Sequence, residues 1–331
     1  MKYCFILFLG FVPALLQAQA PSEPLPARNA VPAKEITTAD AGPAAAQQVR
    51  TWQLQVSRQP ADATAWLNYY LWTSRDKTVN DKEQLLAGII TNAGQHIRGR
   101  PEYDLMRYLQ SGKKDSASLY RVMNSGMDKS ISYPYLVQFF TERGDDAAVN
   151  NYCLELEALK PLPRDQYEYH YNVLMSAGPG ATVYAKGIYD LVPLCILQQV
   201  YGVRPDIRLR TYAGPVIGDT MAYLCLTLGR DILAGYPDAV YTGLLVQLSG
   251  TSPGDLEKHV EQDFDLSQLN GPEVLSPDAV LLYRNYLPAL VLLYEHYKKT
   301  GSDRVQAGRD RLIRVARKTG LQQQIDQLTK E

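Results

Sequence analysis

The tripeptide Gly178-Pro179-Gly180 divides the chain into two parts with different patterns of apolar residues. Two glycines around a proline interrupt regular structure, because proline lacks a backbone N–H and glycine adopts open turns easily. Before this break, apolar residues recur at the three- and four-residue spacing of helices that bury one face. After it, short runs of valine, tyrosine and leucine alternate with helical segments. The sequence therefore predicts a helical first part and a mixed second part.

The first part, residues 44–177, predicts paired helices with short connections. Asp62 precedes an apolar run and suits the N-terminal cap of a helix. Pro101 suits the first turn of a second helix that continues to Gln110. Gly144-Asp145 separates two further apolar segments, and the acidic residues there suit a helix N-terminus. A last helix is expected over residues 164–177.

One of these pairs resembles a tetratricopeptide repeat, which has large and small residues at fixed positions on two helices. The residues that fall at those offsets are Tyr133, Leu136, Phe140, Gly144, Cys153 and Pro161. Val149 departs from the pattern, because it occupies a position that favours a small residue. An ordinary helical bundle explains the same spacing, and both interpretations remain open.

Aromatic residues gather in the first of these helices. They are Trp66, Tyr69, Tyr70 and Trp72, preceded by Trp52. Aromatic side chains offer a large contact area with a polar tip, so a partner-binding surface is one hypothesis. At helical spacing, burial in the core is the more frequent fate of such residues.

The second part predicts a small α/β unit with a parallel sheet and a helical tail. Strands are expected over 182–185, 207–213 and 239–248, and helices over 191–201 and 220–233. A further helix is expected from Pro253, and another begins at Ser276-Pro277 and kinks or ends at Pro288. The last two helices turn at Gly301-Ser302 and carry a basic face, interpreted as solvated, with Arg304, Arg309, Arg311, Arg314, Arg317 and Lys318.

Ligands of parallel sheets bind beyond the carboxyl ends of the strands. Lys186, Tyr189 and Asp190 follow the first predicted strand and are therefore candidate ligand-binding residues. A capped, solvated turn, with Asp190 at the start of the next helix, is the favoured interpretation. Gly202 suits the end of that helix. Pro205 is expected to hold Arg204 in an extended conformation that starts the next strand.

The same segment carries a resemblance to a known family. The matching residues are Gly187, Asp190, Pro193, Leu194, Gln198 and the run Gly202-Val203-Arg204-Pro205-Asp206. They resemble the extracytoplasmic C-terminal region of bacterial multi-spanning membrane proteins similar to protein O-mannosyltransferases. The resemblance implies a fold and a compartment; the transferase chemistry would belong to the family's membrane region. Ile188 and Tyr189 replace polar turn residues of the family pattern.

The first twenty residues predict a signal peptide, which we favour over an uncleaved membrane anchor. Lys2 precedes an apolar run over 5–16, and Ala18-Gln19-Ala20 supplies small residues for cleavage after Ala20 or Ala18. Residues 21–43 are rich in proline and alanine and predict a flexible linker. The mature chain is therefore expected to be periplasmic or extracellular, with no integral membrane span.

Composition narrows the function classes. The formal net charge is −1 and no basic block is present, which argues against nucleic-acid binding. Three cysteines follow the predicted signal peptide, and buried thiols are favoured over a Cys195–Cys225 disulfide. The sequence carries no recognised cofactor motif, so no cofactor is predicted. The histidines His96, His170, His259 and His296 lack metal-ligand spacing, so no metal site is predicted either.

One enzyme motif requires attention. Gly250, Ser252 and Gly254 match the Gly-x-Ser-x-Gly pattern of serine hydrolases, and His259 is nearby. In that fold the residue after the serine donates its backbone N–H to the oxyanion, and Pro253 has none. A helix start with Ser252 as cap is therefore the preferred interpretation, and the chain is predicted to be non-enzymatic.

Three functional hypotheses result. The first is an exported protein-interaction module of the bacterial cell envelope, accessory to a glycosylation or export assembly and bound to another envelope protein. The second is a periplasmic protein that binds a glycan or another small ligand at the strand ends. A hydrolase centred on Ser252 is the third.

Overall fold

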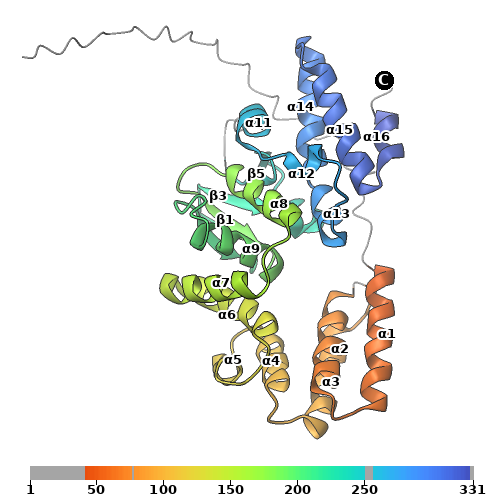
Figure 1. Ribbon diagram of the computed structural model, residues 1–331, viewed down its shortest axis with the longest axis vertical. Helices are drawn as coiled ribbons and strands as arrows, with labels where there is room; N and C mark the ends of the chain where they lie inside the picture. The colour runs from red at the N-terminus through yellow and green to blue at the C-terminus, as the bar shows by residue number, and fades with distance from the viewer. Residues whose placement is uncertain (1–41, 77, 250–255, 329–331) are drawn as a thin grey trace, which may run out of the picture.

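The computed structural model describes residues 42–76, 78–249 and 256–328. It is mainly helical, with a small five-stranded sheet and a helical tail, as the sequence predicts. Figure 1 shows the elements following one another along the long axis, from α1–α3 at one end to α14–α16 at the other, with the sheet between them. The predicted signal peptide, most of the linker and the Ser252 motif lie outside the described residues.

Eight helices precede the sheet within the described residues. They are α1 (Gly42–Arg58), α2 (Ala63–Arg75), α3 (Lys82–His96), α4 (Pro101–Gln110), α5 (Ser116–Met123), α6 (Lys129–Arg143), α7 (Asp146–Leu159) and α8 (Arg164–Met175). The short connections bring several of these helices into contact with the next one in the chain, and α1 with α2 and α6 with α7 make the most extensive of these contacts.

The helix ends follow the predicted signals. The carboxylate of Asp62 accepts the N–H of Ala65 at 3.0 Å, which caps α2. Gly144 ends α6 in a left-handed conformation with φ 71°, and Asp145 then caps α7 by accepting the N–H of Ala148 at 3.1 Å. Left-handed backbone costs glycine little, so the chain reverses direction at this point without strain.

The sheet contains β1 (Thr182–Ala185), β2 (Arg208–Thr211), β3 (Ala222–Cys225), β4 (Val240–Tyr241) and β5 (Leu245–Gln247). Their order is β2-β1-β3-β5-β4. The pairs of β1 with β2 and with β3 are parallel, whereas β5 runs antiparallel to both β3 and β4. The sheet is therefore mixed: the predicted parallel pairing is correct for β1, β2 and β3 and wrong for β4 and β5.

Two element predictions in this region are wrong. The segment 220–233 was predicted as one helix. It contains instead β3, the turn η1 (Leu226–Leu228) and the short helix α10 (Arg230–Leu233). A strand buried on both faces is uniformly apolar, and such a run has no periodicity that separates it from a helix. The strand predicted over 239–248 is a hairpin, because Gly243 turns the chain with φ 133°.

Helix α9 (Ile188–Gln199) connects β1 to β2, and the segment after it differs from prediction. Gly202 is left-handed, as expected after a helix, but Arg204 is also left-handed, with φ 47°, rather than extended. Its guanidinium donates to the carbonyl oxygens of Leu174 and Ala177 at 3.1 and 2.9 Å, and to the carboxylate of Asp206. These bonds offset the backbone cost and tie the end of α8 to the start of β2.

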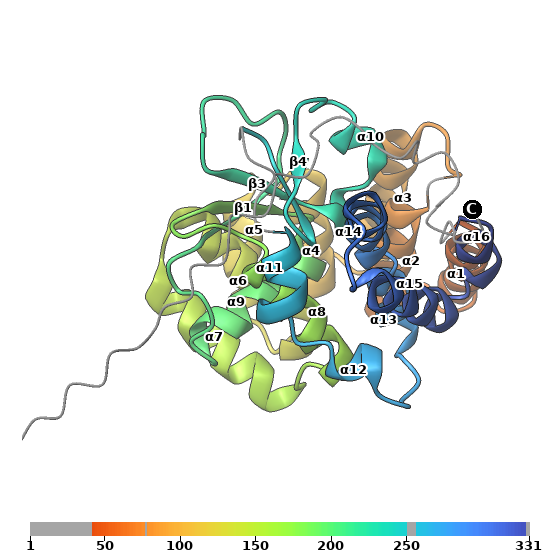
Figure 2. The same cartoon turned by 90° about the horizontal axis from the view of Figure 1, so that it is seen from above.

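After β5, the chain forms α11 (Leu256–Lys258), the π-helical turn η2 (His259–Asp263), α12 (Ser267–Asn270), α13 (Pro277–Tyr283), α14 (Tyr286–Thr300), α15 (Val305–Thr319) and α16 (Gln322–Leu328). Figure 2 shows α14 and α15 side by side, as their contacts require. The prediction for Pro288 is wrong: the break falls at 284–285, and Pro288 lies in the first turn of α14. Backbone N–H groups in the first turn of a helix have no intrahelical acceptor, so proline loses no hydrogen bond at this position.

The basic face of α15 is not simply solvated. Arg304 pairs with Glu257, and Arg311 pairs with Glu261, donating from Nη2 at 2.7 Å. The ammonium of Lys318 donates to the carbonyl oxygens of Gln268 and Glu273 at 2.6 and 2.8 Å. These side chains therefore hold the segment 256–273 against the tail.

Buried apolar residues form two main cores. The smaller extends from Val56 to Phe139, and the larger from Val137 to Ile325. The larger core includes α7 and α8 as well as the sheet and the tail, so it crosses the predicted boundary between residues 177 and 178. A third, small cluster lies on the other face of the sheet around Leu224 and Val246.

Cys153, Cys195 and Cys225 are buried free thiols, in agreement with the favoured prediction. In the described part of the chain, no helix is both long enough and apolar enough to cross a membrane.

Candidate functional site

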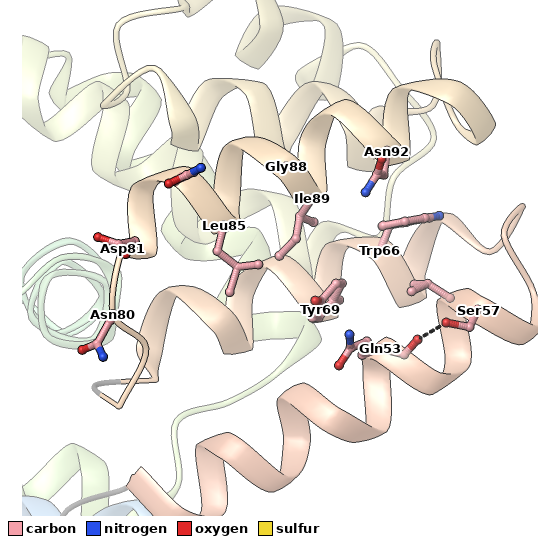
Figure 3. A pocket seen from close by; sticks show the side chains of 12 residues that line it. Gln53, Ser57, Trp66, Tyr69, Asn80, Asp81, Leu85, Gly88, Ile89 and Asn92 are labelled. Atoms are coloured by element: carbon pink, nitrogen blue, oxygen red, sulfur yellow. Dashed lines mark hydrogen bonds between the residues drawn. The ribbon is translucent and has the colours of Figure 1, made fainter.

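A groove of about 580 Å³ opens between α1 and α3, with α2 at its base (Figure 3). Helix α2 packs against both neighbours, whereas α1 and α3 make little contact with each other. The groove is lined by Gln53, Val56, Ser57, Trp66, Tyr69, Asn80, Asp81, Gln84, Leu85, Gly88, Ile89 and Asn92.

Local contacts fix the position of the groove floor. The indole N–H of Trp66 donates to the carbonyl oxygen of Pro60 at 2.8 Å, which fixes the connection between α1 and α2. Its ring stacks on His96 with a centre separation of 6.3 Å. Trp66 is 6% exposed and Tyr69 is 8% exposed. Their rings therefore present edges to the groove while most of each side chain belongs to the core.

The walls contribute apolar and small residues. Leu85 is 38% exposed, an unusual fraction for leucine on a helix that packs in a core, and Ile89 lies one turn further along α3. Gly88 lies between them, and a Cβ added there would meet no atom within 4 Å. The groove therefore continues over the surface of α3 at this position.

The rim is formed mostly by side-chain amides: Gln53, Asn80, Gln84 and Asn92. None of the four amide groups has a hydrogen-bond partner among the described residues, although each can donate and accept. Asp81 is the single charged residue of the lining. It holds a left-handed backbone, with φ 52°, at the start of α3.

The predicted aromatic residues divide between three environments. Trp66 and Tyr69 line the groove, whereas Tyr70 is buried and its hydroxyl donates to Gln110 at 3.2 Å. Trp72 is half-buried on another side of α2, where the guanidinium of Arg75 lies 5.1 Å from its ring centre. The four residues do not form one surface.

The predicted strand-end residues also separate. Lys186 is exposed, and Tyr189 is 60% exposed with the guanidinium of Arg75 at 4.8 Å from its ring centre. Asp190 is only 3% exposed. Its carboxylate accepts the N–H of Lys186 at 3.0 Å and the hydroxyl of Thr227. Asp190 thus joins the turns after β1 and β3.

A buried histidine lies beside this carboxylate. The Nδ1 atom of His170 donates to the carbonyl oxygen of Gln166 at 2.8 Å, so Nε2 carries no proton in the neutral ring. Nε2 lies 3.9 Å from the carboxylate of Asp190 and has no hydrogen-bond partner among the described residues. Both side chains are almost fully enclosed.

The described residues contain no group of three histidine, cysteine, aspartate or glutamate side chains that could hold a metal ion. His259, near the predicted hydrolase motif, contacts the carboxylate of Asp263 at 2.9 Å through Nδ1. Ser252 and Pro253 themselves lie outside the described residues.

Sequence reasoning missed most of the groove. The amide residues on α1 and α3 show no motif, and their convergence depends on how three helices pack. The combination of an exposed leucine, a helical glycine and several amides along α3 is the one signal that could have indicated a binding surface. Comparison with known proteins adds no constraint: no protein-family model, curated protein or solved structure matches the chain.

Proposed function

We propose that this chain is an exported, non-enzymatic interaction module of the bacterial cell envelope, which holds an extended segment of a partner protein in the groove between α1 and α3. The observation that carries the proposal is the pairing of an apolar floor with a rim of unpaired amides. Paired helices commonly present such surfaces to partner segments.

The amides favour an extended peptide as the occupant. A peptide backbone presents N–H and C=O groups in alternation, and each side-chain amide can pair with both. The rim follows α3 from Asp81 to Asn92, which is roughly 16 Å at the helical rise of about 1.5 Å per residue. An extended chain advances about 3.3 Å per residue, so the groove accommodates about five residues.

Side-chain preferences follow from the floor and from the charge. Leu85, Ile89 and the ring edges of Trp66 and Tyr69 would receive one or two apolar side chains of the segment. Asp81 disfavours acidic residues at the α3 end and favours a neutral or basic one. The expected ligand is therefore a short segment with an apolar centre and no net negative charge.

Export and the envelope location rest on the sequence alone. The first twenty residues carry a signal-peptide pattern, and the proline- and alanine-rich residues 21–43 suit a linker. The resemblance to the extracytoplasmic region of mannosyltransferase-like proteins favours a partner in envelope glycosylation or export. Fractionation of cells that produce the tagged full chain tests this part; recovery of an uncleaved chain from the cytoplasm would refute it.

The groove is tested with a library of displayed peptides selected against the purified protein. We expect enrichment of peptides with an apolar centre and no excess of acidic residues. The blocking variant is Gly88→Trp, which places an indole in open space on the groove wall and leaves the helix intact. It should abolish binding of the selected peptides.

Gly88→Ala is the matched control. It changes the same residue but fills little of the groove, so it should retain binding of the selected peptides. Failure to select any peptide, or unchanged binding by a folded Gly88→Trp protein, would disprove the groove as the binding site.

A further inference from the structure

A second hollow lies on the opposite side of the sheet from α8 and α9. It encloses about 390 Å³, within the range of about 300–1,000 Å³ that is typical of small-ligand sites. Its lining is almost entirely polar: Thr182, Tyr184, Arg208, Arg210, Thr211 and Asp219. None of these residues belongs to the groove between α1 and α3.

The strand register brings the polar groups together. In the parallel pair, Thr182 of β1 lies opposite Arg208 of β2, and Tyr184 lies opposite Arg210. Alternate residues of a strand point to the same face, so all four project on one side of the sheet. The small apolar cluster around Leu224 covers this face over β3 and β5, and the ring of Tyr184 on β1 packs against it. Arg208 and Arg210 on β2 are exposed.

The two arginines are poorly satisfied by the protein itself. The guanidinium of Arg208 has no hydrogen bond or ion pair with any described residue. Arg210 donates only a long bond, at 3.5 Å, to the carbonyl oxygen of Glu142. The one carboxylate of the lining, Asp219, accepts the N–H of Met221 at 3.0 Å and the hydroxyl of Tyr184 at 3.4 Å. Two guanidinium groups therefore face one carboxylate, and the hollow carries one excess positive charge.

One hydroxyl group of the hollow is free to bind. Thr182 is 4% exposed, and its hydroxyl has no partner among the described residues. The side chain of Thr211 alternates with that of Arg210 and therefore lies on the other face of the sheet, where its hydroxyl oxygen accepts a bond of 2.8 Å from the buried amide of Gln138.

We infer that this hollow binds an acidic sugar unit, a ring with one carboxylate and several hydroxyl groups. The ligand's carboxylate would pair with Arg208 and Arg210, whose planar guanidinium groups match two carboxylate oxygens. Asp219 and Thr182 would bind the ring hydroxyls. A phosphate dianion fits less well, because its second charge would oppose Asp219 without a matching cation.

The inference does not depend on the groove between α1 and α3, so either can fail alone. Its test is calorimetric titration of the purified full chain with glucuronate, galacturonate, glucose and inorganic phosphate. We expect binding of at least one of the two uronates, no binding of glucose, and weaker binding of phosphate. Binding should weaken as ionic strength rises, because the contact pairs charges.

The test variant is the double substitution Arg208→Gln and Arg210→Gln, in which both side chains are exposed and removable without loss of packing. Loss of two charge-assisted contacts should reduce uronate affinity about tenfold or more. Thr182→Val, which keeps the side-chain shape, should weaken binding severalfold. Arg98→Gln, an exposed arginine on another element, is the control and should leave affinity unchanged.

Any one of three results would overturn the inference. One is absence of uronate binding in a folded protein, and another is phosphate binding equal to that of the uronates. The third is undiminished affinity in the double variant with an unchanged melting temperature.

Discussion

The guanidinium of Arg75 lies 4.8 Å from the ring centre of Tyr189, which joins the end of α2 to the start of α9. The same guanidinium lies 5.1 Å from the ring centre of Trp72. A cation between two aromatic faces is attracted by both ring quadrupoles. This cluster connects α2 to α9.

The contact predicts a measurable coupling between Arg75 and Tyr189. In a double-mutant cycle with Arg75→Met and Tyr189→Leu, urea denaturation should give a coupling energy of roughly 0.5–1 kcal/mol. Methionine keeps much of the arginine stem, so the loss reports mainly on the charge. The same cycle with Arg98→Met in place of Arg75→Met should give no coupling, and a zero value for both pairs would rule the contact out as stabilising.

Gly88→Ala should stabilise the protein by about 0.5–1 kcal/mol, because alanine loses less backbone entropy than glycine in a helix. The added Cβ meets no atom within 4 Å, so no steric cost opposes the gain. Thermal or urea denaturation measures the difference. A destabilised variant would show that the wall of the groove is more closely packed than described.

Asp190→Ala should destabilise the protein by about 1.5–3 kcal/mol, because the N–H of Lys186 and the hydroxyl of Thr227 lose a charged acceptor in a buried place. The adjacent exposed change Tyr189→Ala should cost less. Urea denaturation of both variants distinguishes a structural carboxylate from a ligand-binding one. A neutral effect of Asp190→Ala on stability would favour the ligand-binding hypothesis for the strand ends.

Asp206 predicts a pH dependence of stability. The hydrogen bond from Arg204 holds the pKa of the Asp206 carboxyl well below its usual range, with a further contribution from the N–H of Gly180. An acid whose pKa is depressed on folding stabilises the protein above its unfolded pKa and loses this effect as pH falls.

Asp206→Asn should therefore lower the melting temperature at neutral pH. The difference from wild type should shrink as pH falls below about 4, where the unfolded-state carboxyl becomes protonated. Scanning calorimetry across this range measures both proteins. A difference that stays constant with pH would contradict the ion pair.

The three thiols should be unreactive in the native protein. Burial raises the pKa of Cys195 to about 12, and burial likewise raises the pKa values of Cys153 and Cys225. Only the thiolate reacts with alkylating agents. In a Cys4→Ser variant, iodoacetamide at mildly alkaline pH should modify no cysteine until urea unfolds the chain, when three should react by mass spectrometry. Rapid labelling before unfolding would mean that the larger core opens easily.

Local signals predicted much of the fold. Asp62, Pro101 and Gly144 fix helix ends through their own backbone chemistry, and these positions were correct. The strand over 182–185 was also correct, because a short apolar run lies directly after the glycine-rich break. Where a residue acts through its immediate neighbours, its sequence context suffices.

Features that depend on distant contacts were not predictable. Arg204 is left-handed because its guanidinium reaches carbonyl oxygens of α8 about thirty residues earlier, which no local rule anticipates. β3 is a strand because β1 and β5 flank it on both sides. The groove and the arginine hollow depend on helix packing and on strand register, so their residues had no common motif.

The larger core has a consequence for the order in which a growing chain can fold. Its buried residues include Tyr169 on α8 and Ile325 on α16, so it cannot close until nearly the whole chain has emerged from the ribosome or from a translocation channel. The smaller core is complete once α6 is free. During that interval α7 and α8 present an uncovered apolar face, and this is the stage at which a chaperone would have a surface to bind.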